Sequence, residues 1–366
     1  MPASLRRRKP IDRLHSPMKT NGWVWITAGC LWLAGGACHA IVGRLEVESS
    51  SYELLAAQEA FSGLAKITVE GGCCGTTGSG YLLNNEWLLS AAHVVFGQNP
   101  SNIRIDRGTE SSSVRQMYFT NEWQANPVTG LQQGGDLVLL HLAEPFQYSA
   151  QTHLASGALD DRFAVMLGMG RGGNGVLGAY DIPLARAATN TIDRQLQTSG
   201  GGGFLVADFD SGADAQNTLD LRSVNQRYYD DGFTAPLPSD LLLNGMDTKS
   251  LADATRDGII QSLFPEIPDV WLEGTTANGD SGGPLLVYDG ATGEWQLAGV
   301  TSWGFNPSLP EGFARGDSRY GDVSFFTDLS QHTDWVAATI PEPGLPALLG
   351  AALVVLLRRK RWIGGK

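Results

Sequence analysis

The stretch NGDSGGP at residues 278–284 places one serine among three glycines and ends on a proline. Glycine adopts turn conformations that other residues avoid, so the stretch predicts a tight turn that presents the hydroxyl of Ser281. In such a turn the backbone N–H groups of Gly279 and Ser281 can point to one side, where they would stabilise an oxyanion. A glycine-rich turn without any chemistry is the alternative interpretation of this stretch taken alone.

Two upstream segments supply the groups that an attacking hydroxyl requires. An apolar run leads through small residues to His93 in LLSAAH (88–93), and Asp136 opens an apolar strand in GGDLVLL (134–140). A serine hydroxyl is a weak nucleophile, a neutral imidazole can take its proton near pH 7, and a carboxylate orients the imidazole. Taken singly, His93 could be a core histidine and Asp136 a turn residue. Together, in the order His, Asp, Ser, the three residues predict nucleophilic catalysis.

The sequence resembles the trypsin-like serine protease family over about residues 60–200 and 270–340. The matching motifs are AAH (91–93), DLVL (136–139), GDSGGP (279–284) and TSWG (301–304). The resemblance implies an endopeptidase that hydrolyses peptide bonds through an acyl-enzyme on Ser281. It implies His93 as the base, Asp136 as the residue that orients it, and a hydrogen bond from Ser302 to Asp136. The sequence has no zinc-type spacing of His and Cys, and we expect no metal and no cofactor.

Short strand-type runs recur between glycine-rich turns, which predicts an all-β fold. The runs include LAKITV (64–69), EWLLSAAHVV (86–95), DLVLLHL (136–142), FAVMLGMG (163–170) and WQLAGVTSW (295–303). The family resemblance implies two packed six-stranded antiparallel barrels, at about residues 60–150 and 151–326. A terminal helix is predicted at 327–340. The stretch 210–268 is rich in Asp, Asn, Ser and Pro, and we interpret it as an insertion into the second barrel with some helix at 250–264.

The resemblance also locates a specificity pocket. In trypsin-like enzymes the residue at the pocket base lies six positions before the serine, and an Asp there selects Arg or Lys; this chain has Thr275. The other residues expected to line the pocket are Thr276, Ser302, Trp303, Gly304 and Ser324. A neutral pocket lacks the ion pair that favours a basic side chain. We therefore expect small, polar or medium apolar residues before the cleaved bond.

Residues 1–40 are typical of a secretory signal peptide, because a basic stretch precedes a short apolar run and small residues. Signal peptidase cleavage after Ala40 would leave Ile41-Val42-Gly43 at the new N-terminus. In the family, a freed Ile-Val-Gly terminus folds inward and pairs with the Asp before the nucleophile, here Asp280. Coincidence is the alternative, because the spacing to His93 is roughly ten residues longer than usual.

The C-terminal residues 341–366 start with Pro-Glu-Pro, continue with the apolar segment 344–357 and end on a cationic cluster. This order resembles the PEP-CTERM sorting signal of Gram-negative envelopes, and it implies an exosortase-type sorting enzyme as a partner. The tail is the only part of the chain expected to meet a membrane, and the protein is expected in the cell envelope or outside the cell. An amphipathic tail is the alternative interpretation.

The protease domain expected between these ends, residues 41–340, carries 15 Lys and Arg against 36 Asp and Glu, a net charge near −21. Such a charge repels phosphate backbones and excludes nucleic acid as a partner. Its only cysteines, Cys73 and Cys74, are neighbours, and a disulfide between them would be strained. Val94 stands where the family often has a pairing cysteine. The expected partner is a protein or peptide substrate; the alternative function is a catalytically silent, protease-like binding protein of the cell envelope.

Overall fold

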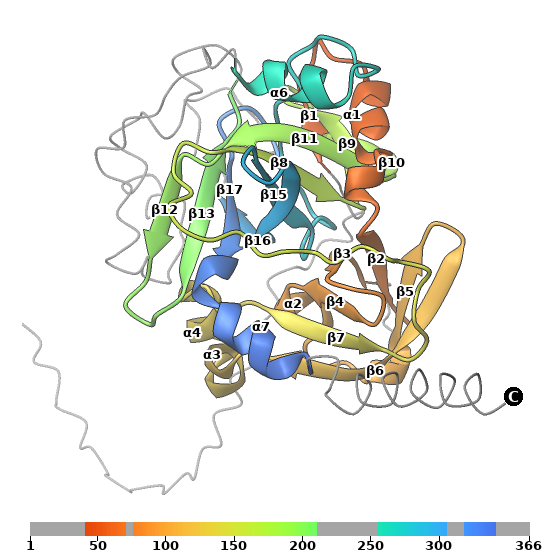
Figure 1. Cartoon of the computed structure of the whole chain (residues 1–366), viewed down its shortest axis with the longest axis vertical. Helices are drawn as coiled ribbons and strands as arrows, with labels where there is room; N and C mark the ends of the chain where they lie inside the picture. The colour runs from red at the N-terminus through yellow and green to blue at the C-terminus, as the bar shows by residue number, and fades with distance from the viewer. Residues whose placement is uncertain (1–40, 71–75, 211–254, 306–317, 342–366) are drawn as a thin grey trace, which may run out of the picture. The chain divides into compact units, whose positions relative to one another are not determined.

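A computed structural model of the chain describes residues 41–70, 76–210, 255–305 and 318–341 (Figure 1). The expected signal peptide, both cysteines of the body, most of the expected insertion and the apolar tail lie outside these ranges. Within the described ranges, no helix is long and apolar enough to cross a membrane.

The first half of the body is a closed antiparallel barrel with the strand order β2-β3-β4-β7-β6-β5. Its strands are β2 (Leu64–Val69), β3 (Thr76–Leu82), β4 (Trp87–Ser90), β5 (Ile103–Arg107), β6 (Glu110–Phe119) and β7 (Val138–Leu142). Strands β4 and β7 are neighbours, and Ser90 pairs with Val138. Because the two strands are antiparallel, the end of β4 and the start of β7 lie at the same edge of the barrel. His93 follows β4 and Asp136 precedes β7, so the pairing brings both to that edge.

The second half is built on a seven-stranded sheet with the order β11-β8-β15-β16-β17-β13-β12. Its strands are β8 (Phe163–Gly168), β11 (Arg186–Thr191), β12 (Arg194–Gln197), β13 (Gly203–Asp208), β15 (Pro284–Asp289), β16 (Glu294–Phe305) and β17 (Val323–Asp328). The predicted all-β, double-barrel class is confirmed. In the part of the chain that is described, the second barrel is a half-barrel of seven strands and not a closed ring of six.

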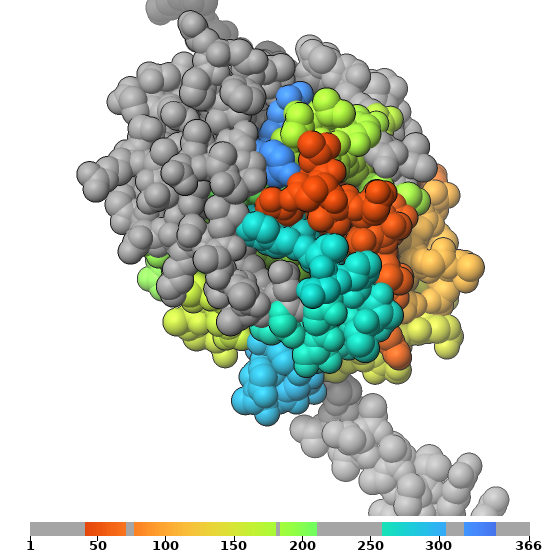
Figure 2. Space-filling view, turned by 90° about the horizontal axis from the view of Figure 1, so that it is seen from above, coloured from red at the N-terminus to blue at the C-terminus, as the bar shows by residue number. Residues whose placement is uncertain are grey.

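A small four-stranded sheet fixes the N-terminal residues to the second half. It has the order β10 (Gly178–Pro183), β9 (Arg171–Asn174), β1 (Val42–Gly43) and β14 (Gly274–Thr275). Val42 pairs with Thr275 on one side and with Gly173 on the other. Ile41 and Val42 are fully buried. In Figure 2 the N-terminal segment, in red, accordingly lies between segments coloured green and teal.

The helices are short: α1 (Ser49–Ala56), α2 (Ala92–Val95), α3 (Asn121–Ala125), α4 (Pro127–Gln132), α6 (Thr255–Leu263) and α7 (Thr333–Thr339). The terminal helix starts later than predicted, because Asp328 first caps a 3₁₀ turn over Leu329–Gln331 by accepting the N–H of Ser330. The run 86–95 does not form one strand as predicted. It leaves the sheet after Ser90, and α2 follows.

Candidate active site

His93 and Asp136 are joined by two hydrogen bonds. His93 Nδ1 lies 2.7 Å from Asp136 Oδ2, and the backbone N–H of His93 donates to Asp136 Oδ1 at 2.9 Å. The Asp136 side chain is fully buried, whereas 35% of the His93 side chain is exposed. A carboxylate only accepts hydrogen bonds, so the imidazole donates from Nδ1. Nε2 is then the nitrogen that can accept a proton from a neighbouring group.

The second half contributes a further donor to Asp136. The hydroxyl of Ser302, on β16, donates to Asp136 Oδ2 at 2.6 Å. A buried carboxylate is costly unless hydrogen bonds replace its water shell. Asp136 receives three such bonds, two from His93 and one from Ser302. The bond from Ser302 also ties β16 to the edge of the first barrel.

The pKa of His93 reflects two opposing effects. Burial of the imidazole acts to lower the pKa, but the negative charge of Asp136 and the hydrogen bond to it raise the pKa more. The net result is a pKa above the ordinary value of 6.5. Asp136 thus stabilises the imidazolium form that appears whenever His93 takes a proton.

The segment 278–284 forms the tight turn that its glycines predict. Gly279 and Gly282 have φ angles of 96° and 84°, in the region that glycine adopts without steric cost. The N–H of Gly282 donates to the carbonyl of Thr301 at 2.8 Å, and the N–H of Gly283 donates to the carbonyl of Asp280 at 2.7 Å. The turn is therefore held by β16 one residue before Ser302.

Ser79, on β3, docks this turn against the first barrel. Its N–H donates to the Ser281 carbonyl at 2.8 Å, and its hydroxyl donates to the Gly279 carbonyl at 3.0 Å. A Cβ on Gly282 would overlap Ser90 Oγ and the Ser79 carbonyl, so only glycine fits there. Ser90 ends β4, three residues before the histidine. The turn with Ser281 thus packs on the segment that carries the imidazole.

The structure brings Ser281 and His93 into the same region without a direct bond. Within residues 41–70, 76–210, 255–305 and 318–341, no hydrogen bond joins the Ser281 hydroxyl to His93. Ser281 is partly exposed, so a substrate can reach it. Hydrogen bonds of this kind are often long in ligand-free enzymes and tighten when substrate binds.

Two of the residues expected to line the pocket, Thr275 and Thr276, contact the hydroxyl of Ser324, which is a third. Ser324 Oγ lies 2.8 Å from Thr275 Oγ1 and 2.9 Å from Thr276 Oγ1, and it accepts the N–H of Thr276 at 3.1 Å. Ser324 pairs with Gly304 across β17 and β16. The result is a neutral cluster of three hydroxyls next to the strand of Gly304, where, among the described residues, a Cβ on the glycine would meet only the Val323 carbonyl at 3.5 Å.

Trp303 lies apart from this cluster. Its ring stacks on Phe325, with centroids 3.8 Å apart. Trp303 pairs with Phe325 whereas Gly304 pairs with Ser324, and neighbouring residues of a strand point to opposite faces of a sheet. The indole is therefore on the face away from the hydroxyls.

Asp280 and Ile41 are both fully buried. Burial raises the pKa of the Asp280 carboxyl well above its ordinary range, against the N–H bonds from Ala277 and Gly170 and the charge of Arg186, which lower it. Those N–H groups donate at 2.9 Å and 3.4 Å. No ion pair joins Ile41 to Asp280 in the described structure, because Ile41 is in peptide linkage to Ala40 and has no free amino group.

Comparison with known proteins places the chain in a family. The sequence profile of the family described as Trypsin matches residues 56–217 and 270–336, more than half of the chain. The chain belongs to the trypsin family. It is also 26% identical to Trypsin-1 of Astacus astacus over 276 residues, which cover 70% of this chain and 85% of that relative. Membership of the trypsin family supports a protease that acts on proteins or peptides.

Within this trypsin-family chain, Ser79 holds the turn that carries Ser281, and this role was not among the sequence predictions. Its signal is Gly78-Ser79-Gly80, because small residues inside a strand often mark a close approach of another backbone. A Cβ on Gly78 would lie 2.6 Å from Val94 Cγ1 and 3.1 Å from the Ser281 carbonyl oxygen. Val94, next to His93, therefore packs directly over β3.

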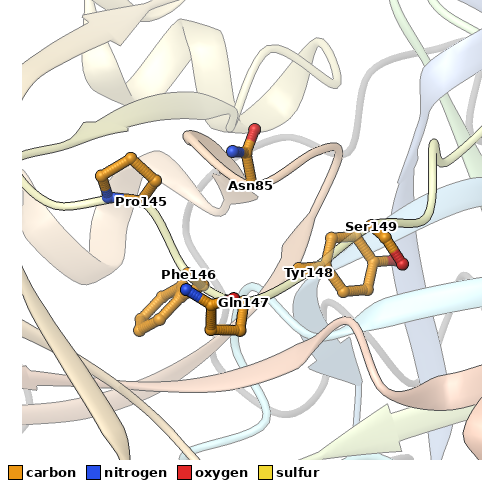
Figure 3. A pocket seen from close by; sticks show the side chains of 6 residues that line it. All are labelled: Asn85, Pro145, Phe146, Gln147, Tyr148 and Ser149. Atoms are coloured by element: carbon orange, nitrogen blue, oxygen red, sulfur yellow. The ribbon is translucent and has the colours of Figure 1, made fainter.

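A pocket with a volume of about 510 Å³ lies outside the trypsin-family site. Its lining residues are Asn85, Pro145, Phe146, Gln147, Tyr148 and Ser149 (Figure 3). All but Asn85 belong to the segment that follows β7. None of the residues predicted for catalysis or specificity lines this pocket, so it gives no support to the proposals about the site.

Proposed function

We propose that the chain is an exported serine endopeptidase that hydrolyses peptide bonds through an acyl-enzyme on Ser281. The observation that carries this proposal is the buried carboxylate of Asp136, which accepts hydrogen bonds from His93 in the first half and from Ser302 in the second. This arrangement leaves the imidazole oriented, polarised and partly exposed next to the turn that carries a serine.

In the proposed acylation step, the Ser281 hydroxyl attacks the carbonyl carbon of the scissile bond while His93 Nε2 takes its proton. Asp136 stabilises the imidazolium, which then gives the proton to the leaving amine. The N–H groups of Gly279 and Ser281 stabilise the oxyanion of the tetrahedral intermediate. Each such donor typically lowers the barrier by about 3–4 kcal/mol. Water attacks the acyl-enzyme by the same steps and releases the acid.

Two assays on the purified protein test the proposal. A serine endopeptidase hydrolyses casein and is labelled covalently by a fluorophosphonate, because both reactions need the activated hydroxyl. A catalytically silent binding protein on the same scaffold would bind peptides without cleaving them. Binding without hydrolysis and without labelling would therefore reject the enzyme in favour of that alternative.

The pH dependence of the rate is a first prediction. We expect kcat/KM to fall by about tenfold for each pH unit below the pKa of His93, because only the neutral imidazole accepts the serine proton. Since this pKa is raised, the midpoint of the acid limb should lie above 6.5. A rate profile on a peptide substrate measures it. A midpoint at or below 6.5, or a flat profile across about pH 5 to 8, contradicts His93 as the base.

The substrate preference is a second prediction. We propose that small, polar or medium apolar residues precede the cleaved bond, because the hydroxyls of Thr275, Thr276 and Ser324 give the expected pocket a neutral lining. Ser324→Gly should improve cleavage after larger apolar residues relative to Ala by about tenfold, as expected for a change of this size in a pocket. A peptide-library profile measures the shift. Ser112→Gly, at a buried serine in β6, is the matched control and should leave the profile unchanged.

Two experimental results would contradict the proposed pocket. Cleavage by the wild-type protein only after Arg and Lys would contradict the neutral pocket. An unchanged profile in Ser324→Gly, with normal thermal stability, would show that Ser324 does not contact the substrate.

We also propose that signal peptidase removes residues 1–40 and that an exosortase-type enzyme processes the tail at 341–366 in the cell envelope. The support is the sequence pattern of the two ends. Removal of the signal would free the amino group of Ile41 for an ion pair with Asp280. The burial of both residues supports this pair, since a buried carboxylate needs a partner of opposite charge.

A further inference from the structure

Arg186 is a buried cation that helix α1 holds in place. Its side chain is only 2% exposed. Nε and Nη2 donate to Ser49 Oγ at 3.2 Å and 2.9 Å, and Nη2 lies 3.2 Å from Glu53 Oε1. Ser49 and Glu53 are four residues apart on α1, so both side chains face the guanidinium. Helix α1 lies against β11, the strand that Arg186 opens (Figure 1).

The Cβ end of the Arg186 side chain lies next to the Asp280 carboxylate. Arg186 pairs directly with Gly168, the last residue of β8. Directly paired residues of antiparallel strands project to the same face, with their Cβ atoms about 5 Å apart. The place of the missing Cβ on Gly168 is occupied by Asp280, because a Cβ there would overlap Asp280 Oδ1. The arginine and the aspartate therefore share one face at neighbouring positions.

A glycine-rich segment separates the two charged groups. A Cβ on Gly172 would overlap Arg186 Nη1, so the guanidinium lies directly over the backbone of Gly172. Two residues earlier, the N–H of Gly170 donates to Asp280 Oδ1. The charge of Arg186 acts to lower the pKa of Asp280. In a buried region, where the effective dielectric constant is low, such an attraction extends beyond contact distance.

We propose that Arg186, fixed by Ser49 and Glu53, is a positioning residue whose charge favours the ionised form of Asp280 and so helps to keep the Ser281 turn formed before Ile41 has a free amino group. The unprocessed chain then has a formed catalytic turn and measurable activity. Cleavage before Ile41 adds a second cation to Asp280. The proposal rests on Ser281 as the nucleophile.

The test compares two forms of the protein, the unprocessed chain and the chain cleaved before Ile41. Each form carries either Arg186 or Arg186→Gln, which keeps donors for Ser49 but removes the charge. We expect the unprocessed wild type to react with a fluorophosphonate. Arg186→Gln should lower kcat/KM by at least about tenfold in the unprocessed form and by about threefold or less in the cleaved form, where the ammonium remains; such non-additivity is typical of groups that share a partner.

Two further variants separate charge from packing. Arg186→Lys restores a positive charge without the planar fork, and we expect it to recover most of the activity lost in the unprocessed Arg186→Gln protein. Arg107→Met is the matched control, because Arg107 forms an ion pair with Glu110 in the first barrel. Its effect should be equal in the two forms. Thermal unfolding monitors folding of every variant.

Three outcomes overturn the proposal. If the unprocessed wild type does not react but the cleaved chain does, the amino group of Ile41 is required and Arg186 does not suffice. If Arg186→Gln lowers activity equally in both forms, or Arg186→Lys fails to recover it, Arg186 is only structural. If neither form reacts, Ser281 is not a nucleophile and the proposed function fails as well.

Discussion

Ser281→Ala should lower kcat on peptide substrates by about a millionfold, the loss typical when a serine protease nucleophile is removed. The alanine has no oxygen to form the acyl-enzyme, so fluorophosphonate labelling should disappear completely. KM should change little, because the pocket around Ser324 is intact. Active-site labelling followed by mass spectrometry of the modified peptide, together with casein hydrolysis, measures both effects.

The fold should tolerate this substitution. Ser281 docks on Ser79 through its backbone carbonyl, and an alanine keeps that carbonyl. The melting temperature should therefore stay close to that of the wild type. Ser330→Ala, in the 3₁₀ turn after β17, is the matched control and should keep full activity. Labelling that survives in the Ser281→Ala protein would reject Ser281 as the nucleophile.

Asp136→Asn should lower kcat by about 10,000-fold, as expected for serine protease triads whose acid becomes neutral. An amide can present its NH₂ group to His93 Nδ1, which then acts as an acceptor. The ring proton moves to Nε2, and the imidazole can no longer take the serine proton. The amide also lacks the negative charge that raises the pKa of His93.

A large loss of kcat would show that Asp136 orients the base, in addition to any contribution it makes to the stability of the fold. Asp328→Asn is the matched control, because Asp328 is fully buried in the second half and bonds Gln195 and the N–H of Ser330. It should lower the melting temperature without a comparable loss of kcat. Steady-state kinetics on both variants measures the two values of kcat. Near-normal kcat in Asp136→Asn would contradict the role assigned to Asp136.

Local sequence patterns predicted the strands with continuous apolar runs. The run 64–69 coincides with β2, and 163–170 covers β8. Strands β5 and β6 were not predicted, because neither is a continuous apolar run: β5 alternates two isoleucines with charged residues, and β6 has three serines near its start. The run 86–95 looks uniform in sequence, yet it bends after Ser90. The bend is a tertiary effect, since the N–H of His93 bonds the side chain of Asp136 from another part of the chain.

In the candidate site, too, some features follow from the local sequence and others depend on tertiary contacts. Glycines at 279 and 282 indicated a tight turn, and both adopt positive φ angles. Arg186 could not be predicted, because its role depends on which segments meet in space. The glycines on both sides of Ser79 indicate a close approach of another backbone, but not which segment approaches. Helix α1 was missed because its sequence begins with three serines, which are poor helix formers. Burial of its Tyr52 and Leu55, together with its contact to Arg186, stabilises it instead.

Because the hydrogen bond from Ser302 to Asp136 joins the two halves, we expect the rate of peptide hydrolysis to depend on their relative position. The carboxylate belongs to one half, and one of its three donors belongs to the other. A displacement of about one ångström between the halves would lengthen that bond, and the bonds between Ser79 and the serine turn, beyond hydrogen-bonding distance. The strand pairing within each sheet would stay intact. We therefore expect denaturant to abolish peptide hydrolysis at a lower concentration than the one at which the spectroscopic signal of either sheet declines.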